Sequence, residues 1–191
     1  MPFSKKIFSI GITPFQINHL DNETLCSQVE YVCTNPDNNN KLCTRDMGLN
    51  NPHLRELNEF VLEKSQIILN GMTSDPNVRV FLQEVWGNHN LNEHISVPHA
   101  HRGSFLAAVY YPKSTDARLQ FHSPFTDSLL SHVPVIANNC HEFNSSYYII
   151  YPKTGCLVLF PANLMHIALP SREERYSIVY NIGVDCYSGV Y

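Results

Sequence analysis

Three histidines occur in this chain at a spacing that suits the ligands of one metal ion. His99 and His101 stand two residues apart in the segment Val97–His101. If that segment is extended, both side chains point to the same face, because side chains alternate along a strand. His166 comes sixty-five residues after His101, following a second apolar stretch. Imidazole binds iron, zinc, copper and nickel, so the pattern predicts a metal site and leaves the metal open.

An arginine follows the third histidine and opens a segment that alternates like a strand. In Arg175–Asn181, every second residue from Arg175 onward shares one face, and Ser177 is on that face. A buried cation without a partner is costly. A guanidinium fork with a nearby hydroxyl matches the two oxygens of a carboxylate, so the pair predicts an anion clamp. One alternative is an ion pair between Arg175 and Glu173, Glu174 or another nearby acid. Arg172 is a second candidate for the clamp, ranked lower because it lies in a polar turn.

The elements that must position these residues can be read from the periodicity of the chain. Helical spacing of apolar residues predicts a helix over residues 22–34 and a second helix from Asn51-Pro52 to Ile68. The polar segment 35–49 predicts a loop. Short runs rich in β-branched and aromatic residues then predict strands. These runs are residues 78–82, 105–111, 117–121, 147–151, 156–160 and 176–180.

Two helices followed by short strands predict a mainly β fold, a helix-supported double sheet of the jelly-roll kind. We expect one domain over residues 1–191, with helical support over about 1–75 and the jelly-roll core over about 76–185. The segment 123–146 is the longest stretch without a pattern, and such a loop is often a lid or a substrate loop.

Composition narrows the class of protein and of partner. The 191 residues are 43% hydrophobic and 16% charged, with a net charge of −4 and no basic block, so nothing favours a nucleic-acid partner. No apolar run reaches the length of a membrane span, and none of the six cysteines forms a Cys-x-x-Cys pair. We expect a cytoplasmic protein without a membrane partner.

Several motifs, taken in order, resemble a family of small 2-oxoglutarate- and iron(II)-dependent oxygenases that are common in marine bacteria and phages. The resemblance covers roughly residues 80–185. The motifs that carry it are Trp86-Gly87-Asn88, Pro98-His99-Ala100-His101, Val109-Tyr110-Tyr111, Tyr151–Pro161, Leu164-Met165-His166 and Arg175–Asn181.

The resemblance implies a double-stranded β-helix that holds iron(II) and hydroxylates a substrate while 2-oxoglutarate is converted to succinate. On the family pattern, His99 is the first metal ligand, His166 is the distal one, and Arg175 binds the far carboxylate of 2-oxoglutarate. His101 stands where the wider superfamily has a carboxylate ligand, which raises the net charge of the site by one. We therefore expect His99, His101 and His166 to bind the metal, and Arg175 and Ser177 to bind 2-oxoglutarate.

Further residues are candidates for the pocket. Tyr110 is expected to hydrogen-bond the oxo acid, although alternation allows only one of Tyr110 and Tyr111 to point inward. Trp86, Asn88 and Asn181 are expected to line the pocket together with the inward tyrosine. The substrate is expected to be an unidentified small molecule or peptide, and an exposed aromatic strand would favour a homodimer.

Two other functions are compatible with the same residues. The first is a cupin-like oxygenase with three histidines on iron and no 2-oxo acid, in which Arg175 binds a carboxylate of the substrate. The second is a jelly-roll module without enzymatic activity, in which the metal stabilises the fold.

Overall fold

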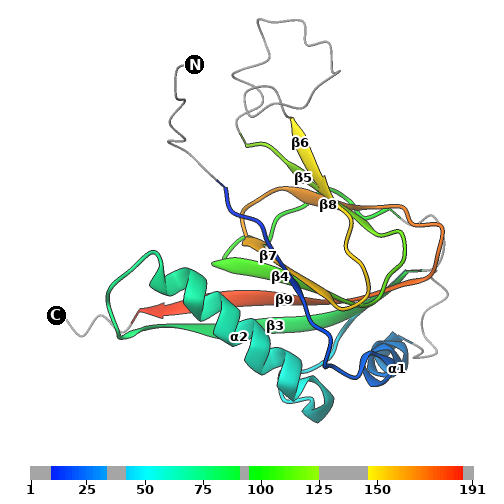
Figure 1. Ribbon diagram of the computed structural model, residues 1–191, viewed down its shortest axis with the longest axis horizontal. Helices are drawn as coiled ribbons and strands as arrows, with labels where there is room; N and C mark the ends of the chain where they lie inside the picture. Colours follow the sequence, from blue (N-terminus) through cyan, green and yellow to red (C-terminus); the bar gives the residue numbers. More distant parts are fainter. Residues whose placement is uncertain (1–9, 34–41, 91–94, 125–145, 187–191) are drawn as a thin grey trace, which may run out of the picture.

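Two antiparallel sheets packed face to face make up most of the structure (Figure 1). The computed structural model describes residues 10–33, 42–90, 95–124 and 146–186. The six-stranded sheet has the order β1-β7-β4-β9-β3-β2, with β1 Thr13–Gln16, β2 Leu42–Asp46, β3 Val78–Asn90, β4 Leu106–Lys113, β7 Cys156–Pro161 and β9 Arg175–Cys186. The three-stranded sheet has the order β6-β5-β8, with β5 Arg118–His122, β6 Tyr147–Ile150 and β8 His166–Leu169. The mainly β class is confirmed.

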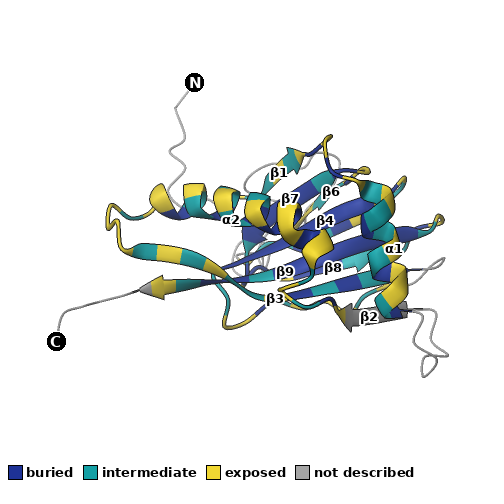
Figure 2. Ribbon diagram, turned by 90° about the horizontal axis from the view of Figure 1, so that it is seen from below, coloured by how far each residue is buried: buried dark blue, intermediate teal, exposed yellow. Residues whose placement is uncertain are grey.

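Two helices cover the outer face of the six-stranded sheet, as the apolar periodicity predicted. Helix α1 spans Asn22–Cys33, and α2 spans Arg55–Asn70 after a short 3-10 turn, Pro52–Leu54. Figure 2 shows that their solvent-facing sides are exposed while the central strands beneath them are buried. Ile67 of α2 is 57% exposed, although it is apolar. Four of the five buried side chains of that helix recur at four-residue steps that miss Ile67, from Leu57 through Val61 and Ser65 to Leu69, and the fifth is Asn58.

The six-stranded sheet separates two apolar clusters. The cluster on the helix side contains Leu25, Val29 and Leu57 from the helices and Ile178 from β9. The cluster between the sheets is built by inward residues of β4, β7 and β9 packed against β5; its members include Val109, Phe160, Val179, Leu119 and Phe121. The cavity described below adjoins this second cluster.

A β-bulge in β3 decides which of its residues face the space between the sheets. The register with β9 shifts between Leu82 and Glu84, with Gln83 as the extra residue. Before the bulge, Leu82 packs on the helix side, whereas after it Trp86 packs against the cluster between the sheets. A bulge of this kind redirects the side chains that follow it, so Glu84 shares the cavity-side face with Trp86.

Several elements differ from the sequence-based prediction. Residues 42–46, predicted as a loop, form the edge strand β2 paired with β3, because strand pairing compensates for their weak apolar pattern. Strand β3 continues to residue 90, and residues 166–169 form a strand that was not predicted. The proposed lid falls largely in residues 125–145, outside the described residues. No helix in the described ranges is long and apolar enough to cross a membrane.

The aromatic strand that would favour a homodimer is β6. Its residues Tyr147 and Tyr148 are 50% and 60% exposed, and β6 is at the edge of the smaller sheet among the described strands. Dimer formation remains a prediction.

Candidate metal centre and adjoining cavity

The fold brings His99, His101 and His166 together at one end of the space between the sheets. His99 and His166 form an isolated antiparallel bridge, with backbone hydrogen bonds of 3.0 and 2.9 Å. The backbone N–H of His101 donates to the Ala162 carbonyl at 2.7 Å. One ligand atom from each of the three histidines lies within 4.8 Å of the others. Pairing between the segment before β4 and the start of β8 therefore builds the cluster.

The geometry of the cluster fits a transition-metal ion. Nε2 of His101 lies 3.3 Å from Nε2 of His166, and the two rings are stacked at 7°. Two nitrogens bound to one ion at about 2.1 Å lie roughly 3.0–3.4 Å apart for angles between octahedral and tetrahedral values. The backbone orients two of the rings, because Nδ1 of His99 donates to the Val97 carbonyl at 2.7 Å and Nδ1 of His166 to the Leu164 carbonyl at 2.9 Å. Their Nε2 atoms then carry lone pairs.

Burial keeps two of these imidazoles neutral. The pKa of His166 is lowered to about 4, mainly by burial and in part by the neighbouring histidines, although the hydrogen bond to the Leu164 carbonyl acts in the opposite direction. Burial and the nearby His99 likewise lower the pKa of His101. A histidine must be neutral to bind a metal through nitrogen. At neutral pH, these two rings are therefore ready to act as ligands.

Arg175 contributes to the same cavity as the three histidines. The cavity has a volume of about 430 Å³, and its wall includes all four residues. Arg175 is 3% exposed, and its Nη1 donates to the Leu169 carbonyl at 3.1 Å. None of the ion pairs among the described residues involves it, and Glu174 pairs with other residues. Burial lowers the pKa of the guanidinium, while the nearby Tyr111 and Asp116 act in the opposite direction.

Polar groups from neighbouring strands surround Arg175 in the cavity wall. Ser177 follows it on the same face of β9, and Asn88 of β3 donates from Nδ2 to the Ser177 hydroxyl at 3.3 Å. Tyr111 of β4 also lines the cavity. Burial raises the pKa of Tyr111, while the charge of Arg175 acts in the opposite direction. Hydroxyl, amide and guanidinium donors therefore converge on one region.

Of the two candidate tyrosines, the structure places Tyr111 rather than Tyr110 at the cavity. Tyr110 lies on the helix side of the sheet, where its hydroxyl donates to Oδ1 of Asn22 at 2.6 Å. The reason is alternation along β4: Val109 and Tyr111 face the smaller sheet, so Tyr110 must face the helices. The expectation that Tyr110 binds the oxo acid is therefore wrong.

Trp86 and Asn181 lie beside His101, and only Trp86 lines the cavity. The Trp86 ring stacks on the His101 ring with centroids 5.5 Å apart. The Asn181 side chain donates from Nδ2 to Oε2 of Glu84 at 2.6 Å and is absent from the cavity wall. Asn181 is on the inward face of β9 as expected, but two residues beyond Val179, past the end of the cavity.

Sequence reasoning missed other residues of the wall. Asn90 pairs with Arg175 across β3 and β9, and its buried Oδ1 has no hydrogen-bond partner in the described part of the chain. Asn90 lies on the same face of β3 as Trp86 and Asn88, because the three residues are two positions apart. The sequence would have predicted it as a wall residue if the predicted strand had extended to residue 90. Other wall residues are apolar and come from other parts of the chain, so alternation along β3 could not have predicted them. They are Ile95, Val97, Leu119 and Ala168.

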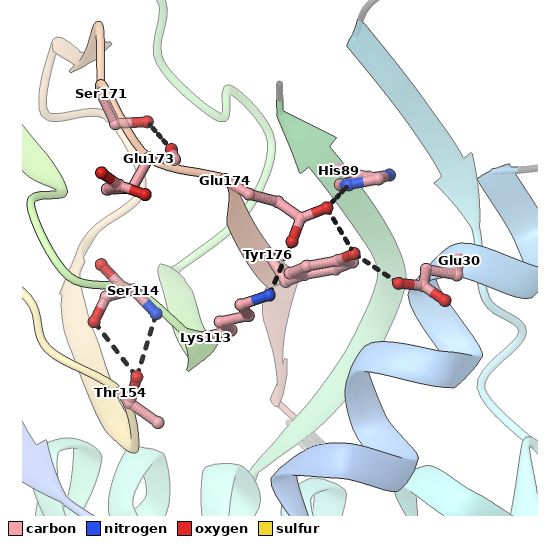
Figure 3. A network of polar contacts seen from close by, with 9 residues as sticks. All are labelled: Glu30, His89, Lys113, Ser114, Thr154, Ser171, Glu173, Glu174 and Tyr176. Carbon is pink, nitrogen blue, oxygen red and sulfur yellow. Dashed lines mark hydrogen bonds and ion pairs between the residues drawn. The ribbon is translucent and has the colours of Figure 1, made fainter. Parts of the chain in front are cut away.

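A network of polar contacts holds the start of β9 on the face of the sheet opposite to the cavity (Figure 3). The Tyr176 hydroxyl donates to Glu30 of α1 and lies 2.9 Å from Oε1 of Glu174. Glu174 also binds His89 at 2.8 Å and Lys113 at 2.6 Å. The network links α1, β3, β4 and β9 next to Arg175, so it restrains the strand that carries the cation.

Comparisons with known proteins agree with this architecture and site. A sequence profile of the family described as "Putative 2OG-Fe(II) oxygenase", in which 2OG is 2-oxoglutarate, matches residues 84–181. No curated protein matches the chain in sequence. The profile carries no information about a marine bacterial or phage source.

Solved structures share the fold at low sequence identity. A 2OG-Fe(II) oxygenase family oxidoreductase from Burkholderia pseudomallei is 12% identical, with a TM-score of 0.60 over 89% of this chain and 84% of that one. HygX from Streptomyces hygroscopicus, with nickel and 2-oxoglutarate bound, is 12% identical, with a TM-score of 0.61 over 91% and 83%. A Pseudomonas putida prolyl-4-hydroxylase is 15% identical, with a TM-score of 0.56 over 91% and 93%. The expected double-stranded β-helix is confirmed.

Proposed function

The chain belongs to the 2-oxoglutarate- and iron(II)-dependent oxygenase family, and we propose that it hydroxylates a substrate while converting 2-oxoglutarate to succinate and carbon dioxide. The observation that carries the proposal is the shared cavity, in which a cluster of three histidines and a buried arginine contribute to one wall. This arginine forms no ion pair within the part of the chain that the structure describes. A divalent metal and a dicarboxylate are the two ligand types that these groups match.

The donor set supports iron(II) with a dianionic co-substrate. We propose that His99, His101 and His166 hold the metal through Nε2. Three neutral nitrogens leave the full charge of a divalent ion to be balanced by other ligands. Of the two carboxylates of 2-oxoglutarate, one would supply negative charge at the metal and the other would pair with Arg175. Bound iron(II) with 2-oxoglutarate supplies the activation of dioxygen that C–H hydroxylation requires.

The chain's own residues would bind and orient the co-substrate. Arg175 would bind the distal carboxylate through its guanidinium fork, with Ser177 and Tyr111 as hydroxyl donors on either side. Asn88 is hydrogen-bonded to Ser177, so it would fix the direction of that hydroxyl. The apolar neighbours of these groups exclude water, which strengthens each polar contact.

The substrate is proposed to be a small molecule or a peptide segment that enters where the cavity wall is exposed. Ile95 and Val97 line the cavity and are 50% and 79% exposed. An apolar wall of this kind suits an uncharged part of a substrate.

One observation favours a second candidate function. The described cluster contains three histidines and no carboxylate, which is also the donor set of an iron oxygenase that needs no 2-oxo acid. Arg175 would then bind a carboxylate of the substrate. A purely structural metal fits less well, because structural zinc sites have four protein ligands and His99 is exposed.

Oxygen uptake distinguishes these functions. Iron(II)-loaded protein is incubated with a panel of small molecules and peptides, with and without 2-oxoglutarate, and succinate is measured alongside oxygen. The proposed function predicts oxygen uptake that requires 2-oxoglutarate and matches succinate formation. Uptake without 2-oxoglutarate would support the second candidate and contradict the first.

A further inference from the structure

The three histidines differ in what holds the ring nitrogen that faces away from the cluster. In His99 and His166, Nδ1 donates to a backbone carbonyl two residues earlier, which leaves a lone pair on Nε2. His101 also presents Nε2 to the cluster, since this atom lies 3.3 Å from Nε2 of His166. Its Nδ1 therefore points away, and the group that fixes it must come from elsewhere in the fold.

The Asn181 side chain supplies an acceptor at this position. Its Oδ1 is buried and has no hydrogen bond of full geometry among the described residues. Asn181 nevertheless lies close enough to His101 to raise the pKa of the imidazole, against the larger lowering by burial. Hydrogen bonds around reactive groups are often loose before ligands bind. The buried Oδ1 of Asn181 can therefore accept a hydrogen bond from Nδ1–H of His101.

Glu84 determines which end of the Asn181 amide faces the histidine. Nδ2 of Asn181 donates to Oε2 of Glu84 at 2.6 Å. An ionised carboxylate only accepts hydrogen bonds, so the amide nitrogen must face Glu84 and the amide oxygen must face the other way. An amide without such a neighbour could turn over and present N–H groups to the ring instead.

The β-bulge in β3 is what brings Glu84 to this place. Because of the extra residue Gln83, Glu84 pairs with Asn181 and both side chains are on the face that carries Trp86. On the other side of β9, Asn181 pairs with Ala107, a fully buried residue whose methyl group takes little room. A bulge beside a functional site commonly serves to aim a side chain.

We propose that Glu84 and Asn181 form a positioning pair that holds His101 as the Nδ1–H tautomer, with the Nε2 lone pair directed at the metal position. Without this pair, His101 can carry its proton on Nε2 and donate it to Nε2 of His166. That hydrogen bond would join two of the ligands and would have to break before a metal could bind. The inference rests on the metal-binding role proposed for the cluster. Neither Glu84 nor Asn181 touches the metal in this account.

The tautomer can be measured directly in the metal-free protein. Long-range proton–nitrogen NMR distinguishes Nδ1–H from Nε2–H imidazoles, and spectra are recorded well above the ordinary histidine pKa. We expect Nδ1–H for His101 in the wild type and a shift toward Nε2–H in Asn181→Ala. Nε2–H in the wild type, or no shift in the variant, would overturn the proposal.

Asn58→Ala is the matched control. Asn58 is also a buried asparagine whose Oδ1 has no partner in the described ranges, and its Nδ2 donates to the Leu49 carbonyl. It lies in α2, away from the cluster. This variant is expected to lose some stability and to keep the wild-type tautomers, which separates general loosening of the fold from the specific effect.

Metal affinity provides a second readout. Loss of a group that orients a metal-binding histidine typically weakens binding by about 10- to 100-fold, and we expect this range for cobalt(II) binding to Asn181→Ala. The double variant Glu84→Gln/Asn181→Asp reverses the pair, because the new amide donates to the new carboxylate, which accepts from His101. The double variant should bind cobalt(II) nearly as tightly as the wild type, whereas Glu84→Gln alone, which no longer fixes the direction of the Asn181 amide, should bind it more weakly.

The two readouts also separate this inference from the function proposed above. A wild type that binds no cobalt(II) would remove the metal site itself, whatever the tautomers are. A wild type that binds cobalt(II), with Asn181→Ala binding equally well, would remove only the positioning role.

Discussion

Replacing Arg175 by methionine should change ligand affinity and stability in opposite directions. Methionine has a similar length and no charge, so it fills the space of a side chain that is 3% exposed. In the ligand-free protein, the described residues offer the guanidinium the Leu169 carbonyl and no ion-pair partner. The arginine therefore costs stability until an anion binds.

The magnitudes follow from the burial of the charge. Breaking a buried ion pair by removing one partner costs about 3–5 kcal/mol, which weakens 2-oxoglutarate binding by roughly two to three and a half orders of magnitude. Replacing buried ion pairs by well-packed apolar side chains is often neutral or stabilises by about 1–4 kcal/mol, and for the single charge of Arg175 we expect about 1–2 kcal/mol. In a domain of this size, that gain raises the Tm by roughly 2–8 °C.

The assay is calorimetric titration of 2-oxoglutarate into nickel(II)-loaded protein, with thermal unfolding of the ligand-free form. Arg118→Met is the matched control, because Arg118 also donates to a backbone carbonyl, that of Pro170, but is exposed and outside the cavity. It should bind 2-oxoglutarate normally and gain no stability. Unchanged affinity in Arg175→Met would refute the clamp, and a large loss of stability would show that Arg175 serves the fold instead.

Three further predictions concern the two tyrosines of β4 and two perturbed pKa values. Tyr111→Phe should weaken 2-oxoglutarate binding and leave the stability unchanged. Tyr110→Phe should leave the affinity unchanged but lose the hydrogen bond to Asn22 and about 1 kcal/mol of unfolding free energy. If calorimetry and urea unfolding gave the reverse result, Tyr110 would belong to the site after all. Because burial lowers the pKa of His166 from 6.5 to about 4, only the unfolded chain gains this proton between those values. The metal-free protein should therefore lose up to roughly 3 kcal/mol as pH falls from about 6.5 to 4, and equal urea-unfolding pH profiles for wild type and His166→Phe would contradict this. Hydrogen bonds, mainly from Lys113 and next from His89, lower the pKa of Glu174 from 4.5 to about 2. The ionised carboxylate therefore stabilises the fold at pH values above 4.5, and this stabilisation is lost as the pH falls toward 2. After allowance for its exposure, Glu174→Gln should cost about 0.5–1 kcal/mol at neutral pH, and a variant as stable as the wild type in urea would show that the network contributes nothing.

The sequence predicted the parts of the site that depend on residue type and local spacing. His99 and His101 reach one cluster with His166, and Arg175 and Ser177 share a face of β9, because alternation along a strand is a local property. These residues also carried the family resemblance that the profile match confirmed.

What the sequence could not predict depends on which face of a strand is turned inward. Tyr110 and Tyr111 are equally plausible until the register of β4 is known. The bulge at Gln83 exchanges the two faces on which the following residues of β3 lie, and no local sequence pattern predicts it. The position of Glu84 beside Asn181 follows from that bulge, because a strictly alternating strand would have placed Glu84 on the helix side.

The polar edge strand β2 was missed for a related reason. Its residues 42–46 were predicted as a loop because they have little apolar character, and their strand structure comes from pairing with β3. Tertiary pairing of this kind routinely overrides weak local propensity.

The central claim is that one cavity holds a metal at the histidines and 2-oxoglutarate between that metal and Arg175. The most direct test is anaerobic titration of iron(II) and then 2-oxoglutarate, followed by the visible metal-to-ligand charge-transfer band of the chelate. The account predicts a band in the wild type that is absent in His166→Ala and, at the same concentrations, in Arg175→Met. Bound iron(II) without a band in the wild type would contradict the claim, as would a band of equal strength in Arg175→Met.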